Sequence, residues 1–368
     1  MKIAIDASRA FVEERTGIEE YSYQVIKNLR GKLGEENQVL LYGYRGARKR
    51  IDFKLPKNWE FKEVAWNKLW TQIGLSWVIK NDAPDVLFVP AHNLPWLHPK
   101  NSVVTIHGLE YEHFPESYGL ISVLFHRFFI KKSCRWARVL IAVSENTKKD
   151  LEKLYKVKSE KITVIANGFE ISNQKTEENV KEKIKNISKE PFCLFLGRIE
   201  LRKNVDNIAR AFDLLKSRYN YPGKLILAGR PGYGYEKIKK SINDLSGANS
   251  IEELGYLSIA EKELLLSKAD LFFFPSLAEG FGIPILEAQS VGTPVITSSF
   301  GPMDEVAGDK NILVNPKDST VMAKLASKMI SDNKFREKVI ANGLKNAKRF
   351  SWDKCAREVA EVILGVVN

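Results

Sequence analysis

Cysteine is scarce in this chain, and long hydrophobic runs are lacking. The three cysteines, Cys134, Cys193 and Cys355, lie far apart and form no Cys-x-x-Cys pair, so neither a disulfide framework nor a zinc site is expected. No run approaches the roughly 18 consecutive apolar residues of a transmembrane helix. The first residues lead directly into a strand-like run without the apolar core of a signal peptide. We therefore expect a cytoplasmic protein.

A basic module that would bind nucleic acid is also lacking, although the net charge is +12. Residues 1–170 hold 27 basic and 20 acidic side chains, and the remainder holds 30 and 25, so neither half is strongly basic. The local exception is residues 119–140, with five basic residues, several aromatic ones and no acid. This pattern is typical of an amphipathic helix on an anionic membrane surface. The alternative is a helix that packs its aromatic residues into the first domain.

Length and periodicity predict two α/β domains. A chain of 368 residues is long for one hydrophobic core. Short β-branched or apolar runs alternate with helical patterns, as in parallel sheets covered by helices. We expect an N-terminal domain over residues 1–170, a polar linker over 171–190 and a second domain over 191–350. Ser351 is the expected N-cap of a last helix that begins at Trp352.

Twelve runs are the expected strands. In the first half they are Ile3–Asp6, Gln38–Tyr42, Val86–Val89, Ser102–Ile106, Arg138–Val143 and Lys161–Ile165. In the second half they are Phe192–Leu196, Lys224–Ala228, Ile251–Leu254, Leu271–Phe274, Pro294–Thr297 and Ile312–Val314. A tryptophan-rich stretch, Trp66, Trp70, Ile73 and Trp77, falls on one helical face. We expect this stripe to be core, with an exposed docking surface as the alternative.

The most informative stretch runs from Glu279 to Glu287 after the expected strand Leu271–Phe274. Gly280 and Gly282 would let backbone N–H groups approach a ligand at the start of a helix, where the partial positive charge favours phosphate. Two acids beside such an anion site would be unfavourable unless they accept hydrogen bonds from neutral hydroxyl groups. The pattern therefore predicts sugar and ribose binding, whereas the alternative is two solvated glutamates around a loop.

A second anion site is predicted where the strand Phe192–Leu196 ends. Gly197 and Arg198 follow the strand, and Lys203 and Asn204 stand at the start of the next helix. Arg198 and Lys203 could neutralise a diphosphate; the alternative is two exposed loop cations. The chain has no Asp-x-Asp sequence, which disfavours a carboxylate pair that holds a divalent metal on the diphosphate. We therefore assign no metal and no cofactor.

In the first half, His107 follows the strand Ser102–Ile106 and should lie at the carboxyl edge of a parallel sheet, where open α/β folds bind ligands. The alternative is a hydrogen-bonded structural histidine. His92, which follows Val86–Val89, is the nearest contender among the other histidines. Gly17, in the loop after the first strand, resembles a shortened glycine turn that faces the same crevice.

These motifs resemble those of retaining glycosyltransferases of the GT-B architecture, a family that includes bacterial mannosyl- and glucosyltransferases of envelope polysaccharide synthesis. The family's Glu-x7-Glu motif matches Glu279 to Glu287, and its Gly-Arg…Lys-Asn motif matches Gly197 to Asn204. Its sheet-edge histidine matches His107. Leu254-Gly255-Tyr256-Leu257 is a further landmark. The resemblance covers nearly the whole chain, and it implies two Rossmann-like domains that face each other across a cleft.

Residue by residue, the resemblance implies that Arg198 and Lys203 hold the donor diphosphate, Glu279 the transferred sugar and Glu287 the ribose. His107 would contact the sugar near the reaction centre. The donor side would also include Gly17, Gly280, Phe281, Gly282 and Tyr256. The last helix, 352–368, would pack back on the first domain. The stretch from Thr105 to Glu116 resembles mannosyltransferases and favours GDP-mannose.

The expected activity is retaining transfer of a hexosyl group from a nucleoside-diphosphate sugar to a saccharide or lipid-linked acceptor. Two departures from the family pattern, Gly108 in place of Asp and a single glycine at Gly17, leave the acceptor side open. A sugar-nucleotide epimerase on the same frame is one alternative, and a phosphorylase would need a longer chain. A non-catalytic polyanion-binding protein is another, suggested by the positive charge.

Overall fold

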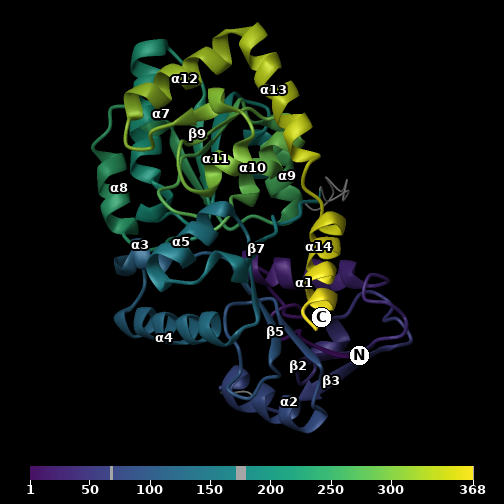
Figure 1. Cartoon of the computed structure of the whole chain (residues 1–368). Coiled ribbons are helices and arrows are strands. Elements are labelled where there is room, and N and C mark those ends of the chain that lie inside the picture. The colour runs from purple at the N-terminus through teal and green to yellow at the C-terminus, as the bar shows by residue number, and fades with distance from the viewer. Residues whose placement is uncertain (67–68, 171–179, 368) are drawn as a thin grey trace. The chain divides into compact units, whose positions relative to one another are not determined.

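The computed structural model describes residues 1–66, 69–170 and 180–367 (Figure 1). The chain forms two compact units. The first consists of Met1–Leu109, Leu120–Gly168 and Phe350–Asn368, and the second of Glu110–Gly119 and Phe169–Arg349. Each unit is built on one parallel sheet with helices. The expected α/β class with two doubly wound sheets is therefore confirmed.

The sheet of the first unit has seven strands in the order β3-β2-β1-β4-β5-β6-β7, and all neighbours are parallel. The strands are β1 (Lys2–Asp6), β2 (Gln38–Tyr44), β3 (Trp59–Val64), β4 (Val86–Val89), β5 (Asn101–Ile106), β6 (Val139–Ala142) and β7 (Ile162–Val164). Strand β3 was not expected from the sequence. The order reverses between β1 and β4, which makes their carboxyl ends a topological switch point.

Most helices of the first unit connect these strands, and the last one follows the second unit in the chain. They are α1 (Gly17–Leu29), α2 (Ser76–Asp82), α4 (Leu120–Trp136), α5 (Glu145–Tyr155) and α14 (Trp352–Gly365), with a π-helical turn η2 (Trp70–Leu75) before α2. The segment Glu110–Gly119, which carries α3 (Glu110–His113), belongs to the second unit. The expected N-terminal domain, residues 1–170, includes this segment, so the observed division differs there.

The sheet of the second unit has the order β10-β9-β8-β11-β12-β13, again with parallel neighbours. The strands are β8 (Phe192–Leu196), β9 (Lys224–Ala228), β10 (Ile251–Gly255), β11 (Leu271–Phe274), β12 (Val295–Ser298) and β13 (Leu313–Val314). The helices are α6 (Glu182–Ile187), α7 (Val205–Tyr219), α8 (Tyr235–Asn243), α9 (Ile259–Lys268), α10 (Ile283–Ser290), α11 (Pro302–Ala307), α12 (Ser319–Ser331) and α13 (Asn333–Ala347). The switch point lies between β8 and β11.

The last helix, α14, packs within the first unit, against α1. Ser351 is its N-cap, as expected, and its hydroxyl accepts a hydrogen bond from the backbone N–H of Lys354. The Trp352 ring contacts the Tyr21 ring at 6.0 Å between centroids. A side chain at Gly168 would lie 2.4 Å from the backbone of Trp352, so only glycine fits where α14 begins. The helix thereby contributes to the same core as the first strands.

The expected polar linker differs from the structure in its second part. The first part of the expected linker, residues 171–179, lies outside the described residues. In its second part Val180, Ile184 and Ile187 are buried. Ile184 and Ile187 form the apolar face of α6, and Val180 precedes the helix; the polar composition obscured this face.

The tryptophan-rich stripe is not a buried face. Trp70 is buried, whereas Trp66, Ile73 and Trp77 are exposed. The regular helical spacing does not hold here, because Leu69 has a left-handed backbone, with φ of 53°, and the following turn is π-helical.

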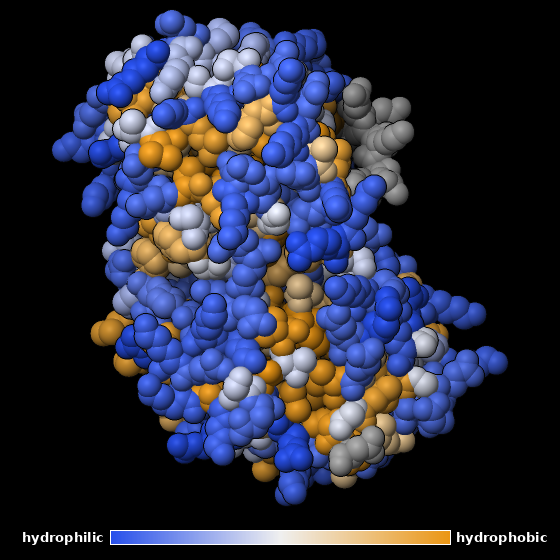
Figure 2. Space-filling view, turned by 45° about the horizontal axis from the view of Figure 1, so that its top comes forward, coloured by the Kyte–Doolittle hydropathy of each residue, from blue (hydrophilic) through white to orange (hydrophobic). Residues whose placement is uncertain are grey.

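The surface carries hydrophobic residues in several places (Figure 2). Within the first unit, α4 exposes Leu120, Ile121, Leu124, Phe125 and Phe128 while its opposite face is buried. In the described part of the chain, no helix is long and apolar enough to cross a membrane.

Candidate active site

The switch point of the second unit brings together two loops that are distant in sequence. After β8 the chain passes through Gly197 into a short turn, η6 (Leu201–Lys203), and then into α7. After β11 it passes through Ser276 and Glu279 into α10. The backbone N–H of Leu277 donates to the carbonyl of Arg202 at 2.9 Å. This bond fixes the two loops at the carboxyl edge of the sheet, where ligands of open α/β folds bind.

Lys203 and Glu279, two of the predicted site residues, form an ion pair at this point. Their side chains are only 13% and 12% exposed. The Lys203 ammonium also lies 5.2 Å from the centroid of the Phe274 ring at the end of β11. The predicted diphosphate cation and the predicted sugar-binding acid therefore lie together, although 76 positions separate them in the chain.

Arg202 is a third member of this cluster, and the sequence reading missed it. Its guanidinium donates to the carbonyl of Ala278 at 2.7 Å and to Glu200 at 2.6 Å, and it lies 3.6 Å from the Glu279 carboxylate. A turn as short as Leu201–Lys203 has no periodicity from which to predict that both of its cations face inward.

The cations decide the ionisation of Glu279. Burial alone would raise the pKa of its carboxyl group, but the neighbouring Lys203 ammonium and Arg202 guanidinium outweigh burial and lower that pKa. Glu279 is therefore a carboxylate at neutral pH. The Arg202 guanidinium also acts to lower the pKa of Glu110, from α3, but burial outweighs it and raises that pKa.

Arg198 lies apart from this network. Its side chain is exposed, and it makes no hydrogen bond or ion pair with another described residue. Asn204, by contrast, is structural: it caps α7 with φ of 64°, and its amide donates to the carbonyls of Pro275 and Pro316 at 3.0 and 2.6 Å. Of the two predicted diphosphate cations, Lys203 is held within the cluster and Arg198 extends into solvent.

The glycine turn before α10 has the predicted form. Gly282 is the N-cap residue with φ of 113°, which favours glycine, and Pro284 stands in the first helical turn. Phe281 is buried beside it. Glu287, within α10, pairs with Lys262 of α9 at 2.7 Å. Tyr256, after β10, is exposed, and the Arg230 guanidinium lies 4.8 Å from its ring centroid.

His107 stands at the end of β5 in the first unit, as predicted. Its Nε2 lies 2.7 Å from the carbonyl oxygen of Pro90. A carbonyl can only accept, so Nε2 carries the proton and Nδ1 is left as an acceptor. The ring also packs edge-on against Tyr21 at 4.6 Å. Burial lowers the pKa of His107 to about 4, so the imidazole is neutral at pH 7.

Two other polar groups lie at the switch point of the first unit. The His92 ring is 5.3 Å from the His107 ring, and burial lowers its pKa well below the ordinary value. Asp6, at the end of β1, accepts from the backbone N–H of Ser8 at 2.9 Å, and burial raises its pKa.

Gly17 is the first residue of α1, after the Thr16 cap. It has no left-handed φ and no described atom within 4 Å of where a side chain would begin. The fold itself therefore does not require glycine at this position. Among the described residues, no three His, Cys, Asp or Glu side chains are grouped so that they could hold a metal ion.

Comparison with known families identifies the class of protein. The model described as Glycosyltransferase Family 4 matches residues 15–173, and the model described as glycosyl transferases group 1 matches residues 176–346. Together they cover most of the chain. The chain therefore belongs to these glycosyltransferases, and the family expected from the motifs is confirmed.

Individual proteins with similar sequences or folds include two mannosyltransferases and one solved structure. O-antigen chain mannosyltransferase B of Escherichia coli is 27% identical over 290 residues, which is 77% of this chain and 75% of that protein. O-antigen chain mannosyltransferase RfbU of Salmonella typhimurium is 29% identical over 262 residues, or 71% and 69% of the two chains. Anabaena HepE, solved in complex with UDP-glucose, has a similar fold, with a TM-score of 0.72 at 19% identity over 99% of this chain and 100% of that chain.

Proposed function

We propose that this glycosyltransferase moves a hexosyl group, with retention of anomeric configuration, from a nucleoside-diphosphate sugar to a saccharide or lipid-linked saccharide acceptor. The observation that carries the proposal is the buried Lys203–Glu279 pair, with Arg202 beside it, at the switch point of the second unit. GDP-mannose is the favoured donor, because two relatives are named as O-antigen chain mannosyltransferases.

In this proposal protein cations stabilise the leaving nucleoside diphosphate. Negative charge grows on the diphosphate as the glycosidic bond breaks, and fixed cations aimed at it lower the barrier. Lys203 and Arg198 contact the diphosphate, and the N-terminus of α10, with Gly280 and Gly282, adds its partial positive charge. No metal takes part.

The two glutamates bind hydroxyl groups. Glu279 is ionised and accepts hydrogen bonds from the sugar, while its contact with Lys203 ties the sugar site to the diphosphate site. Glu287 accepts from the ribose, and Phe281 and Tyr256 flank the nucleotide. The neutral His107 ring, whose Nε2 is committed to Pro90, offers Nδ1 as an acceptor near the transferred sugar rather than as an acid.

Donor identity is tested by thermal shift with GDP, UDP, dTDP and ADP, because a nucleotide that binds the native state raises the melting temperature by mass action. A nuclear magnetic resonance spectrum of the product then gives its anomeric configuration. Stabilisation by GDP and a retained anomer are expected. Nucleotide release that does not depend on acceptor would instead support the epimerase. DNA binding without nucleotide binding would support the polyanion-binding alternative.

The metal-free mechanism is tested separately. The parent enzyme should keep full activity in EDTA, and Arg198→Ala should lose about ten- to a hundredfold in rate, since a charge-assisted hydrogen bond contributes roughly 1.5–3 kcal/mol. Activity that disappears in EDTA and returns with manganese would overturn the mechanism and leave the transferase assignment intact.

The proposal includes peripheral contact with an anionic membrane on its cytoplasmic face, through α4. Ile121 and Leu124, on the exposed face of α4, are 84% and 56% exposed, and basic residues continue the same helix. Weak, salt-sensitive binding to anionic vesicles is expected. Equal binding to neutral and anionic vesicles would remove the electrostatic part of the proposal.

A further inference from the structure

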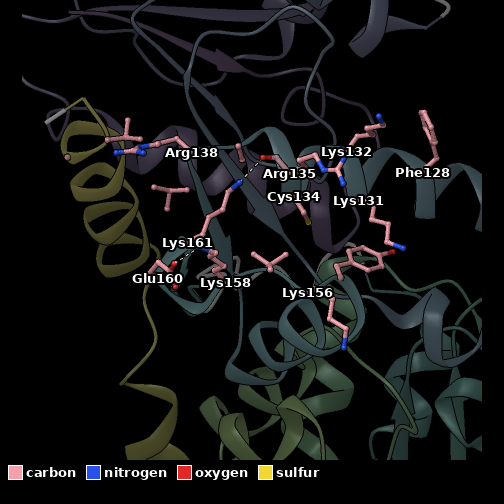
Figure 3. Close-up of a pocket in the computed structure, with 16 residues that line it drawn as sticks. Phe128, Lys131, Lys132, Cys134, Arg135, Arg138, Lys156, Lys158, Glu160 and Lys161 are labelled. Carbon is pink, nitrogen blue, oxygen red and sulfur yellow. Dashed lines mark hydrogen bonds and ion pairs between the residues drawn. The ribbon is translucent and has the colours of Figure 1, made fainter.

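A basic pocket of about 990 Å³ opens in the first unit (Figure 3). It lies at the opposite edge of the sheet from His107. Its lining comes from the C-terminal part of α4, the starts of β6 and β7, the loop between α5 and β7, and the end of α14. The strands begin here, whereas His107 follows the end of one. This pocket is therefore separate from the switch point of the same sheet.

The lining is strongly cationic. Seven of its side chains are Lys or Arg and one is acidic, Glu160. Lys131, Lys132 and Arg135 come from α4, and Arg138 stands just before β6. Lys156, Lys158 and Lys161 come from the other side, after α5, as the labelled side chains in Figure 3 show. Glu160 lies 3.8 Å from Lys158, so its negative charge pairs with one of the seven cations.

Lys161 shows how the pocket is organised. Its ammonium donates to the backbone carbonyl of Arg135 at 2.9 Å, which joins the start of β7 to the end of α4. Burial lowers the pKa of Lys161, and the positive charge of Arg138 lowers it further. Arg138 and Lys161 therefore repel each other, and an anion bound between them would relieve that repulsion.

The pocket continues the exposed apolar face of α4. Leu120, Leu124 and Phe128 recur at intervals of four residues, and Lys131, Lys132 and Arg135 follow on the same helical face. Phe128 lines the pocket, and the Lys132 ammonium lies 5.6 Å from its ring centroid. Along one side of α4, hydrophobic side chains thus lead directly into a cationic recess.

The geometry argues against a reacting substrate here. The four residues of β6 span roughly 13 Å at about 3.3 Å per residue, so the pocket lies at least that far from the carboxyl ends where His107 stands. An anion in the pocket would serve anchoring rather than transfer.

We infer that this pocket receives the phosphate headgroup of an anionic phospholipid while the apolar face of α4 enters the bilayer surface. The inference rests on the proposed membrane contact and names the chemical group that the protein would recognise there. The combination of apolar side chains and cations on one helix face is complementary to a lipid, whose acyl chains and phosphate are adjacent.

The test compares two variants that each remove two positive charges. Arg135→Gln with Arg138→Gln changes the pocket. Arg48→Gln with Lys49→Gln is the matched control, because these exposed residues follow β2, four strands from β6 and so roughly 19 Å away. Binding is measured by flotation with phosphatidylcholine vesicles containing roughly one third phosphatidylglycerol. Circular dichroism confirms that both variants are folded.

A lipid-surface cation contributes about fivefold in binding, so the pocket variant should lose roughly 30-fold and the control less than about twofold. Equal losses would show diffuse attraction and overturn the pocket. A third variant, Ile121→Ser with Leu124→Ser, changes the apolar face of α4. If the parent binds vesicles, and this variant loses binding while the pocket variant keeps it, the pocket inference alone fails. If the parent does not bind at all, the membrane contact fails with it. Tight binding of glycerol 3-phosphate without lipid would assign the pocket to a soluble anion and overturn the lipid.

Discussion

Replacing Lys203 by methionine tests whether its ion pair with Glu279 is as desolvated as the structure indicates. In Lys203→Met the Glu279 carboxylate stays nearly buried and keeps Arg202, whose Nη1 lies 3.6 Å from Oε2. Removing one partner of a buried pair costs about 3–5 kcal/mol. Because Arg202 remains, we expect a loss near the lower end, about 3 kcal/mol, in the free energy of unfolding of the second unit.

The double variant Lys203→Met with Glu279→Met removes both charges of the pair. Replacing a buried pair by apolar side chains of similar size is often neutral or stabilising. The double variant should therefore recover most of the stability that Lys203→Met loses. Both Lys203→Met and the double variant should lack transfer activity.

The assay can separate the two units, because all seven tryptophans belong to the first. Tryptophan fluorescence in urea reports the first unit and should be unchanged. Hydrogen exchange of peptides from β8 and β11 reports the second unit and should show the loss. A loss below about 1 kcal/mol is what a solvent-screened surface pair would give, and it would refute the reasoning.

Three further outcomes are expected. Burial lowers the pKa of His107 to about 4. The free energy of unfolding of the first unit should therefore fall by up to about 3 kcal/mol as the pH drops from about 6.5 to 4, because the unfolded state binds the proton first. In His107→Gln, the urea midpoint should not show this part of the pH dependence. Ser351→Ala should cost about 1 kcal/mol in the same unit by tryptophan fluorescence, through the lost cap of α14, and no shift would contradict that role. Glu287→Gln should weaken donor binding about tenfold, as measured by calorimetry. Lys262→Ala should change the free energy of unfolding in urea by less than about 1 kcal/mol, since the Lys262–Glu287 ion pair is partly exposed.

The fold was readable because most of its strands are buried on both faces. Such strands are continuous apolar runs, as in Leu271–Phe274, and every expected strand is present. Strand β3 was not predicted, because Glu60, Lys62 and Glu63 interrupt its apolar residues. It is an edge strand, where charged residues are tolerated.

The candidate site was less readable than the fold. Glycine and proline turns, as at Gly282 and Pro284, have local signatures that the sequence carries. The contact of Arg202 with Glu279 is a long-range event that depends on which side of a short turn faces inward. The basic pocket was likewise hidden, because its cations come from segments that only the sheet brings together. Charge counts along the chain detected the α4 part of it alone.

The return of the chain at Phe350 has a consequence for biosynthesis. Residues 169–349 leave the ribosome before α14 does, and domains fold as units during synthesis. The second unit can therefore be complete while the first still lacks Trp352, Val359 and Ile363, which belong to its core. Closure of the first core must wait until α14 has been synthesised. A chain that terminates before α14 would carry a folded second unit joined to an open first unit, so that only a chain that includes α14 gains a folded first unit.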